Sequence, residues 1–181
     1  TASRMGPADA IFAGFADHFV PQDDWPELIQ TLCDTGDVSA IAKAARPAGP
    51  APLLEIEQPV NAFFRGDYFG DIVNNLKHTG GEFSEACLKK LARSSPLAMA
   101  ATIELIHRVR GLDDIVLALG MEYRFTYRAA EQGDFIEGIR AMVIDKDKSP
   151  KWRHAMTDPL LPAASAMLRP LGPHSLDLTE N

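Results

Sequence analysis

The strongest constraint on the fold is a four-residue apolar spacing in the second half of the chain. Ile115, Leu119, Tyr123 and Tyr127 recur at this interval, which places them on one ridge of an α-helix. The pattern predicts a helix over residues 113–132. A long helix with an apolar ridge needs other helices or a sheet to cover it, so it organises the elements around it.

A second helical pattern follows at once. Gly133 is expected to end the first helix in the left-handed conformation, and Asp134 with Glu137 has the spacing of a capping box. We expect both helices to pack with a helix that carries Ile103 and Ile106, forming one core. The stripe that the second helix is expected to bury consists of Phe135, Ile139, Met142 and Val143.

The segment after this helix is basic, although the protein is acidic. Residues 145–154 carry four Lys or Arg side chains against two Asp, a local charge of +2 in a chain of formal net charge -7. A local excess of cations on an acidic protein indicates a place where an anion is held. The three lysines are Lys146, Lys148 and Lys151, and Trp152 is interpreted as an anchor that packs on the preceding helix.

The rest of the chain reads mainly as short helices. Ser95 and Pro96 form a cap and a first helical position, and residues 16–20 alternate enough for one short strand. The proline-rich run ARPAGPAP is the best linker candidate. Further helices are expected over residues 67–76, 83–92, 96–109 and 159–171. The expected fold class is mainly α with one short strand near the N-terminus.

Composition excludes several classes of partner. A charge of -7 and a pI near 5.2 argue against non-specific binding of nucleic acid or an anionic membrane, and no apolar run is long enough for a membrane span. Cys33 and Cys87 lack a C-x-x-C pattern and are expected to be reduced thiols of a cytoplasmic protein. The five histidines show no H-x-x-x-H spacing, so no metal is expected.

No catalytic residue is assigned in this chain. Asp17 and His18 are neighbours in the expected strand and would face opposite sides of a sheet, so a structural role is favoured. Glu122 is expected to pair with another helix. Gly80 and Gly81 are interpreted as the end of a helix, because they lack the pattern of a phosphate-binding loop.

Several runs together resemble a known family. They are FRGDYFGDIVNNL, SSPLAMAATIELI, MEYR, DFIEGIRAMVIDKDKSPKW and LRPLGPHSLDL, with TASRMGPADAIFAGFADHFVP at the start. In this order they resemble the C-terminal half of 3-hydroxyisobutyryl-CoA hydrolases, a branch of the crotonase (enoyl-CoA hydratase/isomerase) superfamily. The resemblance implies the C-terminal helical part of a crotonase-like fold, with the short strand left over from its α/β core. Its implied divisions are residues 1–21 (end of the core), 22–52 (connection and linker), 53–172 (helical domain) and 173–181 (tail).

The resemblance also implies a chemistry. Crotonase enzymes hold an acyl-CoA thioester oxygen between two backbone N–H groups, and the hydrolase branch adds acidic side chains. Neither a Gly-rich oxyanion segment nor a P-E-T-x-x-G-x-x-P-D-like segment occurs here, so the chain alone is expected to be inactive without an upstream half. Lys146 matches the family's CoA-binding lysine, and Lys148 and Lys151 join it by charge and proximity.

The resemblance therefore predicts a valine-catabolic acyl-CoA thioester hydrolase. Coenzyme A is expected as part of the substrate, no separate cofactor is expected, and a homo-oligomer is possible. Two alternatives stay open: a hydratase or isomerase on the same scaffold, and a non-enzymatic helical interaction module. Release of a free thiol, against a change in enoyl absorbance, discriminates the two enzymes.

Overall fold

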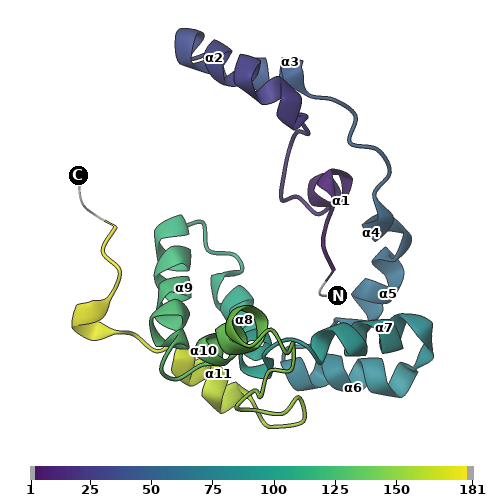
Figure 1. Ribbon diagram of the computed structural model, residues 1–181, viewed down its shortest axis with the longest axis vertical. Coiled ribbons are helices and arrows are strands. Elements are labelled where there is room, and N and C mark those ends of the chain that lie inside the picture. Colours follow the sequence, from purple (N-terminus) through teal and green to yellow (C-terminus); the bar gives the residue numbers. More distant parts are fainter. Residues whose placement is uncertain (1–2, 179–181) are drawn as a thin grey trace. The chain divides into compact units, whose positions relative to one another are not determined.

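A computed structural model describes residues 3–178 of the chain, which form two compact units, residues 3–61 and 62–178. Figure 1 labels the helices of both units. The boundaries expected from sequence, at residues 21, 52 and 172, stay predictions. No helix of the described part is both long and apolar enough to cross a membrane.

The smaller unit consists of short helices. Buried Asp9 joins two of them, because its carboxylate accepts hydrogen bonds from the N–H groups of Gly6 and Leu53 at 3.3 and 2.8 Å. Gly36 ends α2 with a φ of 65°, as its position after the apolar pattern predicts. The helices are α1 (Pro7–Phe12), η1 (Gln22–Asp24), α2 (Trp25–Thr35), α3 (Ser39–Ala44), α4 (Pro52–Glu55) and the start of α5 (Glu57–Phe63).

The expected strand over residues 16–20 is wrong. No strand is present within residues 3–178, and this segment is irregular. A strand is stabilised by a ladder of hydrogen bonds to a neighbour. Here one backbone bond is formed, from Arg46 N–H to Phe19 C=O at 2.8 Å. Alternation of apolar residues is therefore insufficient without a partner strand.

The larger unit contains the remaining helices and a core in two clusters. One cluster joins α6, α8 and α11 through Phe69, Val73, Ala101 and Ala164, and α8 packs most extensively against α11. The other joins α6 to α7 through side chains that include Leu76. The helices are α6 (Phe69–Thr79), α7 (Gly81–Leu91), α8 (Pro96–Val109), α9 (Ile115–Ala129), α10 (Phe135–Ile139), the π-helical η2 (Arg140–Ile144), α11 (Leu161–Met167) and η3 (Gly172–His174).

The prediction of one core from three apolar stripes is wrong. α9 forms close to its expected bounds, but Leu119 and Tyr127 on its ridge are exposed in the described chain. Phe135, Met142 and Val143 are also exposed. The core is instead built where α8 packs against α11 and where α6 packs against α7 and α8, and small residues of α8 and α11 allow those two helices to approach closely.

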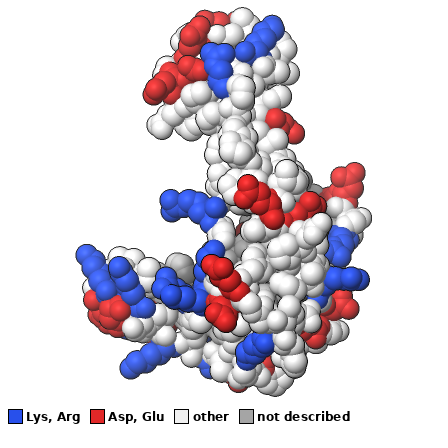
Figure 2. All heavy atoms as spheres, turned by 90° about the vertical axis from the view of Figure 1, so that its right-hand side faces the viewer, with Lys and Arg blue, Asp and Glu red and all other residues white. Residues whose placement is uncertain are grey.

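Both signs of charge are distributed over the protein surface. Figure 2 shows Lys and Arg interspersed with Asp and Glu on the visible face of each unit. Exposed ion pairs of the protein include Lys43 with Asp37 at 3.4 Å and Arg46 with Asp24 at 3.6 Å. The two signs of charge therefore lie beside each other on the face shown.

Candidate functional site

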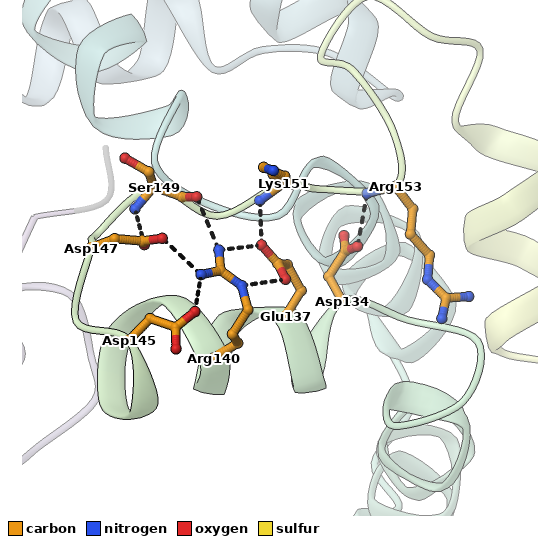
Figure 3. A network of polar contacts seen from close by, with 8 residues as sticks. All are labelled: Asp134, Glu137, Arg140, Asp145, Asp147, Ser149, Lys151 and Arg153. Atoms are coloured by element: carbon orange, nitrogen blue, oxygen red, sulfur yellow. Dashed lines mark hydrogen bonds and ion pairs between the residues drawn. The ribbon is translucent and has the colours of Figure 1, made fainter.

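The candidate site is the segment 145–153, which runs back along α10 and η2 (Figure 3). Three of its backbone N–H groups tether it to this helical run. Arg153 N–H donates to the Asp134 carboxylate at 3.0 Å, Lys151 N–H donates to Glu137 at 2.5 Å, and Lys148 N–H donates to the Ala141 carbonyl at 3.1 Å. The acceptors are three and four residues apart and so lie on one helical face.

Arg140 lies at the centre of the loop. Its guanidinium donates to both oxygens of Glu137, at 2.9 and 2.7 Å, and to Asp145 and Asp147 at 2.7 Å each (Figure 3). It also donates to the Ser149 carbonyl at 3.2 Å. The planar fork of an arginine suits such a set of acceptors, because its N–H groups point in fixed directions.

This network lowers the pKa of two of its carboxylates, Glu137 and Asp147. The Arg140 guanidinium and the N–H of Lys151 lower the pKa of Glu137 to about 2. Arg140 and the N–H of Ser149 likewise lower the pKa of Asp147, and the surrounding carboxylates raise the pKa of Arg140. The two aspartates of the loop therefore pair with Arg140. The local charge count from the sequence had subtracted them from the lysines.

The three predicted anion-binding lysines are exposed on this loop. Lys146, Lys148 and Lys151 form no ion pair within the described part of the chain. Lys146 and Lys148 have φ values of 56° and 54°, a left-handed conformation that residues other than glycine rarely adopt. The hydrogen bonds around Arg140 hold the backbone in this conformation. Such strained backbone is found more often at functional sites than in simple connecting loops. Binding by these lysines stays a prediction.

Trp152 anchors the return segment, as its position predicts. A Cβ built on Gly138 would lie 3.7 and 3.8 Å from two carbons of the indole. The ring therefore lies over Gly138, at a distance that is ordinary van der Waals contact for a Cβ. Gly138 of the DFIEG run and Trp152 of the SPKW run thus pack against each other.

The start of α10 differs from its prediction in two respects. Gly133 is not among the left-handed glycines of the described chain; a Cβ there would lie 2.8 Å from the carbonyl oxygen of Ala129, so close backbone approach requires glycine. The capping box is also wrong, because Asp134 forms no side-chain cap. Its buried carboxylate accepts instead from Ser95 Oγ at 2.5 Å and from the N–H of Arg153.

An apolar cavity of about 450 Å³ adjoins the loop. Its wall includes Trp152 and the exposed side chains Phe135, Met142 and Val143, with Ser95 and Asp134 as polar neighbours. Such a lining suits an apolar group better than a charged one, which would lose its hydration there. The stripe predicted to be buried is therefore the wall of a cavity.

The other residues considered for chemistry are not brought together. Asp17 and His18 are exposed in the irregular segment of the smaller unit, and Glu122 is exposed on α9 of the larger unit. Among the described residues, no group of three or more His, Cys, Asp and Glu side chains is arranged to hold a metal ion. Gly80 ends α6 with a φ of 64°, in agreement with its interpretation as a helix end.

Sequence reasoning missed Arg140. Its signal was present in the spacing of Asp134, Glu137 and Arg140, which are three residues apart and share a helical face. The D-x-D pattern of Asp145 and Asp147 was also present. The charge count assumed that these acids offset the lysines, whereas in the structure both form ion pairs with Arg140.

The family is established by comparison with known proteins. Residues 1–165 match the model of the family described as enoyl-CoA hydratase/isomerase, and the chain belongs to that family. A solved enoyl-CoA hydratase from Rhodobacter sphaeroides 2.4.1 is 46% identical, with a TM-score of 0.78, over 97% of this chain and 51% of that one. The predicted crotonase superfamily is thereby confirmed.

The chain is also similar to curated proteins of this superfamily and to a ribosomal protein. The mitochondrial 3-hydroxyisobutyryl-CoA hydrolase of Xenopus laevis is 30% identical over 84% of this chain and 42% of that protein. The small ribosomal subunit protein mS47 of Schizosaccharomyces pombe is 30% identical over 80% of this chain and 37% of that protein. The chain thus spans about half the length of the relatives it matches or less, consistent with the predicted C-terminal portion of a crotonase-superfamily enzyme. The expected cytoplasmic location stays a prediction.

Proposed function

We propose that this chain is the C-terminal portion of an acyl-CoA thioester hydrolase that acts on 3-hydroxyisobutyryl-CoA or a similar short acyl-CoA. The observation that carries the proposal is the loop of residues 145–153, which presents three exposed lysines without ion-pair partners from a backbone fixed by Arg140. Coenzyme A carries phosphate groups, for which exposed ammonium groups are suitable partners. The similarity to the Xenopus hydrolase supports the choice of reaction.

In this proposal the chain binds and supports rather than performs the chemistry. Thioester hydrolysis on such a scaffold needs oxyanion donors and nearby acids, and the sequence holds no Gly-rich segment beyond Gly80-Gly81. Binding of substrate and transition state with equal strength by the lysines leaves kcat unchanged. We therefore expect the 181-residue chain alone to release no thiol from 3-hydroxyisobutyryl-CoA.

The test compares the chain alone with a protein that joins it to the other half of the fold. Free thiol is measured with a thiol reagent, and enoyl absorbance is followed in parallel. Thiol release by the joined protein, and none by the chain alone, supports the proposal. A change in enoyl absorbance without thiol release would favour the hydratase alternative, which the similarity to the Rhodobacter enzyme also supports.

A second candidate is a non-enzymatic helical module. The observation that favours it is the similarity to a protein named as a ribosomal subunit protein, over 80% of this chain. A crotonase scaffold used in this way would need no thioester chemistry. Absence of both thiol release and enoyl conversion in the joined protein, with coenzyme A binding also absent, would favour this candidate over either enzyme.

A further inference from the structure

The charge balance of residues 134–153 depends on one side chain. This stretch holds five basic and four acidic residues, a net charge of +1. Three of the acids, Glu137, Asp145 and Asp147, contact Arg140 directly. Without this arginine the net charge of the stretch would be zero. Its three carboxylate partners would then lie close together with no cation between them. An anion approaching the lysines would then meet exposed negative charge.

The loop backbone depends on the same side chain. The left-handed residues Lys146 and Lys148 flank Asp147, whose carboxylate bonds both to Arg140 and to the N–H of Ser149. Arg140 also holds the Ser149 carbonyl at 3.2 Å. Without the guanidinium, repulsion among the three carboxylates would open the turn. The unfavourable φ angles would then lose the contacts that maintain them.

We propose that Arg140 is a positioning residue for coenzyme A binding, which neutralises Glu137, Asp145 and Asp147 and so leaves Lys146, Lys148 and Lys151 free to hold a phosphate. The inference rests on the proposed function, since it assigns a role in the same loop. Nε and both terminal nitrogens of Arg140 are engaged by these acceptors, so we expect it to make no contact with the ligand. Its effect is exerted through the lysines.

Binding of coenzyme A to the 181-residue chain, measured by calorimetry, tests the proposal. We expect Arg140→Ala to weaken coenzyme A binding by about fivefold. This is the effect of removing one unit charge at roughly 7 Å in water from a multiply charged ligand. Lys146→Ala is expected to have a similar effect. Arg108→Ala is the matched control, because it removes an arginine–carboxylate pair on α8, away from the loop, with Nη2 and Oε1 2.8 Å apart.

A compensating variant distinguishes charge neutralisation by Arg140 from a merely structural role of this residue. In Arg140→Ala/Asp145→Asn/Asp147→Asn, the two loop carboxylates are replaced by neutral amides of the same size. If Arg140 acts by neutralising these acids, this variant regains most of the lost affinity. If it does not, the positioning role is overturned. Pantetheine, which lacks the nucleotide phosphates, should respond to none of these substitutions.

The outcomes separate this inference from the function on which it rests. Weaker binding in Lys146→Ala with unchanged binding in Arg140→Ala overturns the inference and leaves the lysine site standing. Unchanged binding in Lys146→Ala, Lys148→Ala and Lys151→Ala, or no binding of coenzyme A to the unaltered chain, overturns both the inference and the lysine site, whereas thiol release by the joined protein decides the proposed reaction. Hydrogen exchange of residues 145–153 provides a second readout, which should rise in Arg140→Ala and remain unchanged in Arg108→Ala.

Discussion

Two glycines near the site have different reasons for being glycine. Gly133 has the carbonyl oxygen of Ala129 at 2.8 Å from the place of a Cβ, so any side chain would force the backbone apart. Gly138 has two indole carbons of Trp152 at 3.7 and 3.8 Å, which is ordinary contact for a methyl group. The first position excludes alanine, whereas the second accepts it.

Gly133→Ala should therefore destabilise the protein by about 1–3 kcal/mol, the usual range for a substitution that forces a structural shift. Gly138→Ala is the matched control. It should be neutral or stabilising by up to about 1 kcal/mol, because alanine favours the helix more than glycine does. Chemical denaturation of both variants measures the difference. Equal effects of the two substitutions would show that the close approach at Gly133 does not limit stability.

Glu137 makes the stability of the protein depend on pH in the acid range. Its pKa lies at about 2 in the folded protein against an ordinary value of 4.5. A depressed pKa means that the charged form stabilises the fold, so the contribution is complete above about pH 4.5 and is lost as pH falls toward 2. The difference in unfolding free energy between the unaltered chain and Glu137→Gln should shrink over this window.

Glu85→Gln serves as the control for this titration, because Glu85 is exposed on α7 and forms no ion pair in the described chain. A Glu137→Gln difference that shrinks with falling pH no more than the Glu85→Gln difference would contradict the assignment of the pH dependence to the Arg140 network.

At the level of elements, α9 holds the end of α11 through two arginines. The guanidinium of Arg128 donates to the carbonyls of Met167 and Arg169 at 2.9 and 2.8 Å and to Pro170 at 3.3 Å. These carbonyls lie at and just beyond the C-terminal end of α11, where a helix lacks internal partners and attracts cations. The R of MEYR, Arg124, makes one longer bond, to Leu168 at 3.4 Å.

Arg128→Met should release the segment that follows α11. Methionine retains an apolar stem but removes the donors, so we expect a loss of about 1–2 kcal/mol and faster hydrogen exchange in residues 168–178. Arg124→Met is the control and should have a smaller effect on both. Equal protection of this segment in the two variants would mean that packing, rather than the Arg128 hydrogen bonds, holds it.

In the larger unit as a whole, burial differs strongly between α6 and α9. Leu76 is fully buried in the α6–α7 cluster, at 0% exposure, whereas Leu119 on α9 is 40% exposed. Apolar periodicity is similarly clear at both positions. Buried volume, rather than periodicity, sets the cost of removing a side chain.

Leu76→Ala should lower the unfolding free energy by about 2–5 kcal/mol, because it leaves a cavity in a closed cluster. Leu119→Ala should cost less than about 1 kcal/mol, since its side chain already contacts solvent. Thermal unfolding at low protein concentration measures both. If Leu119→Ala is as damaging as Leu76→Ala, the α9 ridge is covered in solution, and a fall in melting temperature on dilution would identify self-association as the cause.

Most helix positions follow from the local sequence, because capping residues, prolines and apolar spacing act over a few residues. Ser95-Pro96 begins α8 and Gly36 ends α2 as expected. The sequence also identified the family, through the order of its motifs. Three features follow from tertiary contacts instead: residues 16–20 lack a strand partner, Phe135 and Val143 line a cavity, and Arg140 contacts three carboxylates. These features depend on which segments meet in space, and local spacing carries no information about that.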